Sequence, residues 1–151
     1  MSTIRKYDAS TDHDQVVALW RTVFGYGDAH NEPSLVISKK QATNDGLFFV
    51  AVNEAAIVGT VMAGYDGHRG WLYSVAVHPD RRGNGLGRKL VGFAEAALTV
   101  VGCVKINLQL LNSNELTANF YKSLGYRVEP RVSMGKILAP NVQPTNASNA
   151  A

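Results

Sequence analysis

Apolar positions along this chain recur at two spacings, one typical of strands and one typical of helices. Short runs with a period of two, or with unbroken apolar character, predict seven strands, at residues 3–7, 47–52, 57–65, 71–77, 104–110, 126–129 and 132–138. Apolar residues at helical spacing predict four helices, at about residues 10–24, 34–43, 86–101 and 112–124. The pattern therefore predicts a mixed α/β protein of the α+β class, with a sheet of six or seven strands and about four flanking helices.

The connections between these elements predict how the strands pair. Two short polar turns, Asn53–Ala56 and Asp66–Gly70, join strands in the first half of the chain and favour antiparallel hairpins. The helix at 86–101 instead lies between two strands, which implies a parallel crossover. We therefore expect a twisted, mostly antiparallel sheet with one parallel pair.

The last predicted helix presents two features that bear on its packing. Leu116, Phe120 and Leu124 form an apolar stripe, and Tyr121 falls one position off that stripe. Asn112 with Glu115 three residues later resembles a capping box, with Asn in place of Ser or Thr. We expect the stripe to face the core and Tyr121 to border it.

Composition and charge narrow the class of protein. The chain has 151 residues, of which 46% are hydrophobic, so we expect a single domain over residues 1–138. Residues 139–151 are polar and lack periodicity, so a disordered tail is expected there. The N-terminus has no apolar signal core and no stretch is long enough to span a bilayer, which favours a cytoplasmic protein without a membrane partner.

Charge and potential metal ligands exclude further classes of function. The net charge is +3, and the basic residues lack the interleaved aromatics of a nucleic-acid surface, so nucleic-acid binding ranks last. One cysteine and four histidines without ligand spacing predict neither a disulfide framework nor a metal site.

The richest chemical signal is a glycine loop between the predicted strand 71–77 and the predicted helix 86–101. Gly83, Gly85 and Gly87 alternate, and the loop also carries four cations, at positions 81, 82, 88 and 89. Glycines let successive backbone N–H groups turn toward one point, and a helix N-terminus adds partial positive charge. We therefore expect a phosphate-binding loop, the alternative being a plain strand-to-helix corner.

The two commonest nucleotide loops do not match this spacing. A P-loop requires Ser or Thr after its lysine, whereas Leu90 follows Lys89. A dinucleotide loop requires Gly-x-Gly-x-x-Gly, whereas these glycines alternate without a break. The segment from Arg82 to Gly87 instead resembles the Arg/Gln-x-x-Gly-x-Gly/Ala signature of the GNAT N-acetyltransferases.

A second segment strengthens that resemblance. Residues 114–126 are similar to the later GNAT signature, with Asn114, Tyr121, Gly125 and Tyr126 at matching positions. The hexapeptide at residues 65–70 further resembles the small bacterial YpeA-type acetyltransferases. The resemblance implies the GNAT fold, in which strands 4 and 5 splay apart to admit the coenzyme.

The resemblance also implies which residues bind acetyl-CoA, the cosubstrate of this family. Backbone groups of the fourth strand would pair with the pantetheine arm, with an N–H near Val75 facing the thioester oxygen. The loop amides would hold the pyrophosphate, and Asn114 would anchor the arm or position the loop, although first-turn helix chemistry accounts for Asn114 nearly as well. The complete set is Val75, Ala76, Val77, Arg82, Gly83, Asn84, Gly85, Leu86, Gly87, Arg88, Asn114 and Tyr121.

The residues support a general acid for this reaction better than they support a general base. Tyr121 would act as the general acid that protonates the departing thiolate, the alternative being an aromatic packed in the core. Some relatives carry a Glu on the fourth or fifth strand, where this chain has Ser74 and Gln109. A relay through ordered water could replace that base, with Glu32 as the carboxylate that accepts the proton and Tyr73 ordering the water. Asp66 and His68 are the other candidates for the proton acceptor.

The resulting hypothesis is an acetyl-CoA-dependent N-acetyltransferase that passes through a tetrahedral intermediate. Its acceptor could be a small amine, an antibiotic-like polyamine or a protein amine, and family analogy raises a possible homodimer. The alternative is a catalytically silent module that binds acyl-CoA and regulates a partner.

Overall fold

A computed structural model describes residues 2–25 and 29–139, and within these ranges it contains one five-stranded sheet. The strands are β1 (Thr3–Lys6), β2 (Phe48–Asn53), β3 (Ala56–Tyr65), β4 (Gly70–Val77) and β5 (Ile106–Asn107), in that spatial order. β1 to β4 pair antiparallel, and β5 pairs parallel to β4. The mixed α+β architecture and the single parallel pair are thus confirmed.

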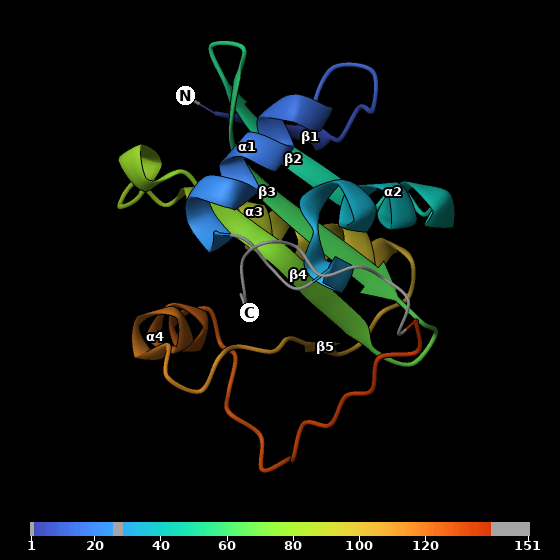
Figure 1. Cartoon of the computed structure of the whole chain (residues 1–151). Coiled ribbons are helices and arrows are strands. Elements are labelled where there is room, and N and C mark those ends of the chain that lie inside the picture. The colour runs from blue at the N-terminus through green and yellow to red at the C-terminus, as the bar shows by residue number, and fades with distance from the viewer. Residues whose placement is uncertain (1, 26–28, 140–151) are drawn as a thin grey trace.

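Helices cover the two faces of this sheet (Figure 1). α1 (His13–Phe24) and α2 (Pro33–Thr43) lie on one face, and α3 (Leu86–Val100) lies on the other. α4 (Glu115–Ser123) lies beyond β5, and short 3₁₀ turns η1 (Ala29–Asn31) and η2 (Pro79–Arg81) precede α2 and α3. No helix within the described ranges is long and apolar enough to cross a membrane.

The core consists of two apolar clusters because the strands alternate their side chains between the two faces. In β2, Phe48 and Val50 pack beneath α1 and α2, whereas Phe49 and Ala51 pack against α3. Gly59 in β3 permits a close contact between the sheet and α3, because a Cβ there would lie 2.8 Å from Leu90 of α3. The central strands are therefore buried on both faces, which explains their nearly unbroken apolar sequence.

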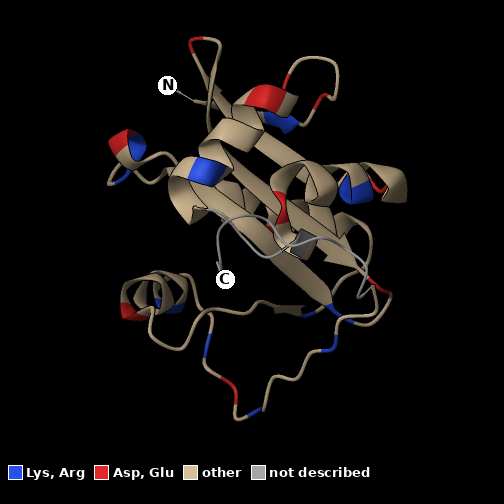
Figure 2. Cartoon of the chain, viewed as in Figure 1, with Lys and Arg blue, Asp and Glu red and all other residues tan. Residues whose placement is uncertain are grey.

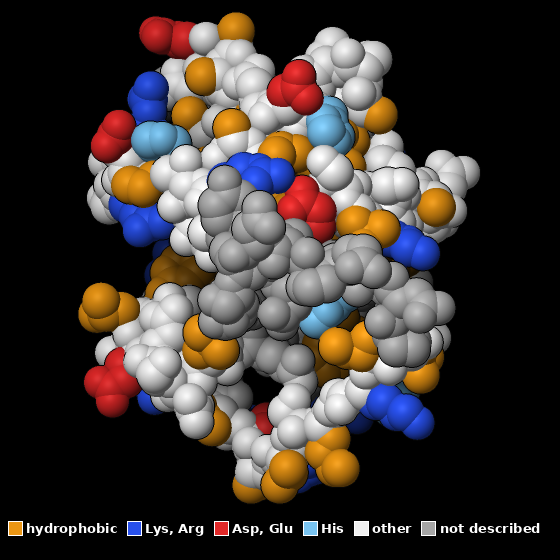
Figure 3. Space-filling view, in the orientation of Figure 1, with side chains coloured by type: hydrophobic (Ala, Val, Ile, Leu, Met, Phe, Trp, Pro, Cys, Tyr) orange, Lys and Arg blue, Asp and Glu red, His pale blue; other side chains and the backbone are white. Residues whose placement is uncertain are grey.

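The expectation of six or seven strands is wrong for the described part of the chain. The strand expected at residues 104–110 shortens to β5, and residues 126–138 contain no strand. Val132 and Met134 remain 88% and 90% exposed. Figure 3 shows apolar side chains at the surface along the bottom of the molecule. Alternating apolar residues need a partner edge before they become a strand, and the two-residue β5 offers only a short one. The tail expected from residue 139 onward lies outside the described residues, apart from residue 139 itself.

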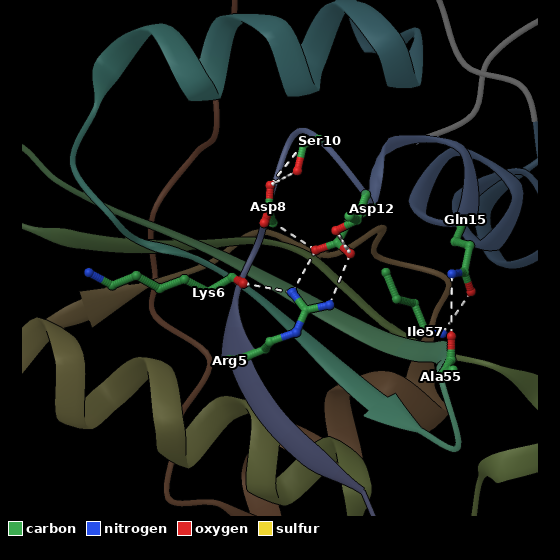
Figure 4. A network of polar contacts seen from close by, with 9 residues as sticks. Arg5, Lys6, Asp8, Ser10, Asp12, Gln15, Ala55 and Ile57 are labelled. Carbon is green, nitrogen blue, oxygen red and sulfur yellow. Dashed lines mark hydrogen bonds and ion pairs between the residues drawn. The ribbon is translucent and has the colours of Figure 1, made fainter.

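Polar contacts fix α1 to the sheet (Figure 4). The buried carboxylate of Asp12 accepts hydrogen bonds from both terminal nitrogens of Arg5, at 2.7 and 2.9 Å, and from the backbone N–H of Asp8 at 2.8 Å. Gln15 accepts from the N–H of Ile57 at 2.9 Å and donates to the carbonyl of Ala55. These contacts hold α1 to β1 and to the β2–β3 hairpin.

Candidate active site

The sheet opens along the edge of β4 that faces β5. The two strands pair only at Gly70 with Ile106 and at Trp71 with Asn107. From Leu72 to Val77, β4 pairs with β3 alone among the described strands, so no strand lies against its other edge, where the carbonyl of Val77 accepts from Arg82. The separation expected between strands 4 and 5 is therefore present, because β5 stops pairing with β4 after Trp71.

The backbone of β4 is irregular in the middle of this open edge. Thr60 of β3 pairs with Ala76, and Met62 pairs with Tyr73, so Ser74 and Val75 together lie opposite one residue of β3. Such an arrangement is a β-bulge, which redirects peptide groups out of the regular ladder. Ser74 has a φ of 49°, in the left-handed region that a residue with a side chain seldom adopts.

The loop after β4 presents an unbroken series of available backbone donors. The N–H groups of residues 83–88 donate no hydrogen bond to any described residue. The series ends on either side at the N–H of Arg82, 3.5 Å from the carbonyl of Pro79, and at the N–H of Lys89, 3.1 Å from the carbonyl of Gly85. Because three of the six groups belong to the first turn of α3, the helix dipole adds to them. The loop is thus suited to bind an anion, with neighbouring cations visible in Figure 2.

The three glycines of the loop serve different purposes. Gly83 and Gly85 have φ values of 84° and 80°, and a Cβ at either would meet open space, so these two are required by backbone conformation. Gly87 lies within α3, where a Cβ would come 3.1 Å from the ring of Phe120. Gly87 therefore allows α4 to pack against the loop, which places the two sequence signatures in contact.

The packing of α4 matches the expected stripe in part, since Phe120 and Leu124 pack against the α3-side core cluster. Leu116 is 85% exposed, whereas Tyr121 is 6% exposed and packs in the core cluster beneath α3. Asn114, rather than Asn112, caps the helix, because its side-chain oxygen accepts from the N–H of Thr117 at 3.2 Å. The helix therefore begins two residues later than a cap at Asn112 requires.

Tyr121 combines a packed ring with an available phenol. Its ring meets Phe120 and Tyr126 edge to face, at centroid distances of 5.0 and 5.6 Å. Its hydroxyl has no hydrogen-bond partner among the described residues. This hydroxyl is not fully enclosed, because the one enclosed polar side-chain atom without a partner in the described residues is the hydroxyl of Tyr7. Burial raises the pKa of Tyr121 to about 12, so the phenol is protonated at neutral pH.

Comparison with known proteins decides the family. The family model described as acetyltransferase (GNAT) domain matches residues 44–128, which is more than half of the chain. The chain belongs to the GNAT acetyltransferases. An acetyltransferase of Yersinia enterocolitica is 37% identical over 135 residues, covering 89% of this chain and 94% of that protein. The protein is accordingly an acetyltransferase.

Solved structures show the same fold at lower identity. An aminoglycoside N-acetyltransferase in complex with CoA aligns with a TM-score of 0.74 at 18% identity, over 91% of this chain and 95% of that one. The PaiA N-acetyltransferase of Thermoplasma acidophilum, in complex with coenzyme A, also aligns with a TM-score of 0.74 at 18% identity. That alignment covers 87% of this chain and 93% of that one.

The residues expected to handle the amine lie apart from Tyr121 in this GNAT acetyltransferase. Tyr73 is 51% exposed and stacks on Trp71, on the face of β4 opposite Leu72 and the α3-side core. Glu32 precedes α2 and accepts a hydrogen bond from Arg21 at 2.9 Å. The described contacts join neither residue to Tyr121. Their catalytic roles stay predictions.

Several other candidates have structural contacts of their own in this acetyltransferase. Asp66 accepts from the N–H groups of His68 and Arg69, in a turn at the far end of β4 from the glycine loop. Gln109 donates to the hydroxyl of Ser133 at 2.6 Å. Arg82 donates its Nε–H to the carbonyl of Val77 at 3.0 Å, which fastens the loop to the end of β4.

Two residues linked by hydrogen bonds to the bulge of β4 were not identified from the sequence. Thr60 is completely buried in β3, and its hydroxyl donates to the carbonyl of Ser74 at 2.8 Å. Trp20 of α1 donates its indole N–H to the same hydroxyl, also at 2.8 Å. The available signal was a hydroxyl within the apolar run 57–63, since a buried polar side chain requires partners.

Proposed function

We propose that this GNAT acetyltransferase moves an acetyl group from acetyl-CoA to a primary amine by direct attack. The observation that carries the proposal is the series of six available N–H groups at residues 83–88, placed beside the open edge of β4. Backbone donors at a helix N-terminus suit a pyrophosphate, and an open strand edge suits the amide groups of a pantetheine arm. The two features are contiguous in the chain, as one extended ligand requires.

Each binding group then has a defined task. Residues 83–88 hold the pyrophosphate, with Arg82 and Arg88 supplying charge. Val75 and Val77 of β4 hydrogen-bond the pantetheine arm, and Ala76 lies between them in the same segment. Asn114 contributes by capping α4, the helix that carries Tyr121.

The chemistry follows from the charges that develop during transfer. A neutral amine attacks the thioester carbonyl, so a C–N bond forms and the carbonyl oxygen becomes an oxyanion, which the N–H of Val75 stabilises. The C–S bond then breaks, and the thiolate takes the phenolic proton of Tyr121. The amine loses its proton to water that Tyr73 orders on the α1–α2 side, with Glu32 as the final acceptor. Glu32 releases that proton to solvent, and Tyr121 regains one from solvent before the next turnover.

The proposal is tested by binding and turnover together. Calorimetry with CoA and acetyl-CoA should show binding of both. Release of free thiol should then be followed with a polyamine, an aminoglycoside, an amino sugar, lysine and short peptides as acceptors. Binding with thiol release on at least one amine supports the proposal. Binding without release on any amine would favour the silent acyl-CoA-binding module, and no heat at millimolar CoA would reject both.

A further inference from the structure

Two successive hydrogen bonds connect the bulge in β4 to α1, which lies in a different layer of the fold. The indole N–H of Trp20 in α1 donates to the hydroxyl of Thr60, and that hydroxyl donates to the carbonyl of Ser74. Both distances are 2.8 Å, and the side chains of Trp20 and Thr60 are 3% and 0% exposed. The Trp20–Thr60 bond is thus buried and the Thr60–Ser74 bond partly buried, and both polar side chains have partners.

This chain of bonds determines the direction of one peptide group. Thr60 lies on β3, so the carbonyl of Ser74 points toward β3. A trans peptide is planar, with its carbonyl and N–H pointing in opposite directions, and the described residues contain no cis peptide. The N–H of Val75 consequently points away from β3, toward the edge that β5 leaves open.

We propose that Thr60 and Trp20 are positioning residues for acetyl transfer, which orient the Val75 N–H toward the carbonyl oxygen of the bound thioester. The inference rests on the proposed function. A left-handed residue such as Ser74 persists only where its surroundings over-determine it, and the carbonyl contact from Thr60 is such a constraint. Without the hydrogen bond from Thr60, the peptide between Ser74 and Val75 can rotate, and the N–H of Val75 no longer points toward the thioester oxygen.

The experiment compares variants of Thr60 in the full-length enzyme. Thr60→Val keeps the shape and removes the hydroxyl, whereas Thr60→Ser keeps the hydroxyl. With the amine that gives the highest wild-type rate, Thr60→Val should lower kcat by about 10- to 100-fold, somewhat less than the loss of a whole oxyanion donor. The KM for acetyl-CoA and the Kd for CoA should stay within about twofold, because the loop and the outer strand edge are unchanged. Thr60→Ser should retain kcat within about threefold.

A matched control separates positioning from stability. Val16 is also completely buried, in the same core cluster as Trp20, but it makes no contact in this hydrogen-bond chain. Val16→Ala should lower the thermal midpoint and leave kcat at 25 °C unchanged. If Thr60→Val does not fold, Trp20→Phe replaces it, with an expected fall in kcat of about threefold to tenfold and unchanged CoA binding.

The outcomes distinguish the inference from the proposed function. Wild-type kcat in Thr60→Val, equal losses in Thr60→Val and Thr60→Ser, or an equal fall in Val16→Ala would each overturn the positioning role. Wild-type enzyme that binds CoA but releases no thiol on any amine would overturn the proposed function, and the positioning role with it.

Discussion

Replacing Tyr121 with Phe removes one oxygen atom and tests the proposed proton donor directly. The ring stays in the core, and the lost hydroxyl has no hydrogen-bond partner among the described residues. We therefore expect the free energy of unfolding to change by less than about 0.5 kcal/mol. Loss of a general acid should lower kcat by about 10²–10⁴-fold. The Kd for CoA should stay unchanged, because the loop amides are intact.

Tyr126 offers a matched control in the same cluster. Its ring contacts that of Tyr121, but its hydroxyl donates to Glu95 of α3 at 2.8 Å. Tyr126→Phe leaves a partly buried carboxylate without this donor, which should cost about 1 kcal/mol. For a chain of this length that corresponds to a fall in Tm of about 3 °C. The rate should change little. Tyr121→Phe is thus expected to lower turnover with little effect on stability, and Tyr126→Phe to lower stability with little effect on turnover.

The assay is continuous thiol release, with thermal unfolding measured on the same preparations. Because the pKa of Tyr121 is raised to about 12, its ionisation should produce no falling limb in kcat between pH 7 and pH 10. A Tyr121→Phe enzyme that keeps kcat within about threefold of wild type would refute the acid role and leave Tyr121 as a core aromatic. A falling limb near pH 9 that disappears in this variant would refute the pKa argument instead.

Three further predictions concern the loop, the amine side and the fold. Gly85→Ala should weaken CoA binding, because an Ala in the left-handed conformation costs about 1–2 kcal/mol at the loop. Gly87→Ala should chiefly lower Tm, because its added Cβ displaces α4. Calorimetry that shows weaker CoA binding in Gly87→Ala, or melting curves that show a lower Tm in Gly85→Ala, would contradict this division. Glu32→Gln should lower kcat about tenfold at neutral pH without changing the Kd for CoA, and an unchanged rate would exclude the relay. Asp12→Asn should cost roughly 2 kcal/mol in urea unfolding. The hydrogen bond from Arg5 lowers the pKa of Asp12 below its usual 3.8, so its contribution is present above about pH 4 and lost below, and the variant should flatten that acid dependence.

The local pattern was sufficient for the central elements because their burial is decided by residues close in sequence. β2, β3, β4 and α3 each contain enough apolar residues to identify them without their neighbours, and the glycine loop has a spacing that restricts its ligand. The same reasoning failed after α4. Val132 and Met134 follow a strand pattern, but a strand also needs a partner edge, and pairing is a property of two segments. The inward position of Tyr121 has a related cause, since the side of α4 that faces the core depends on residues distant in sequence against which it packs.

By itself, the sequence determined the family, the order of the central elements and the loop whose backbone can bind an anion, because each depends on residue types at fixed short spacings. Only the tertiary structure decided that β4 and β5 separate after Trp71, that Gly87 receives the ring of Phe120, and that Trp20 and Thr60 orient a peptide of β4. Those arrangements join residues up to 40 positions apart, and such contacts form only when distant elements pack together.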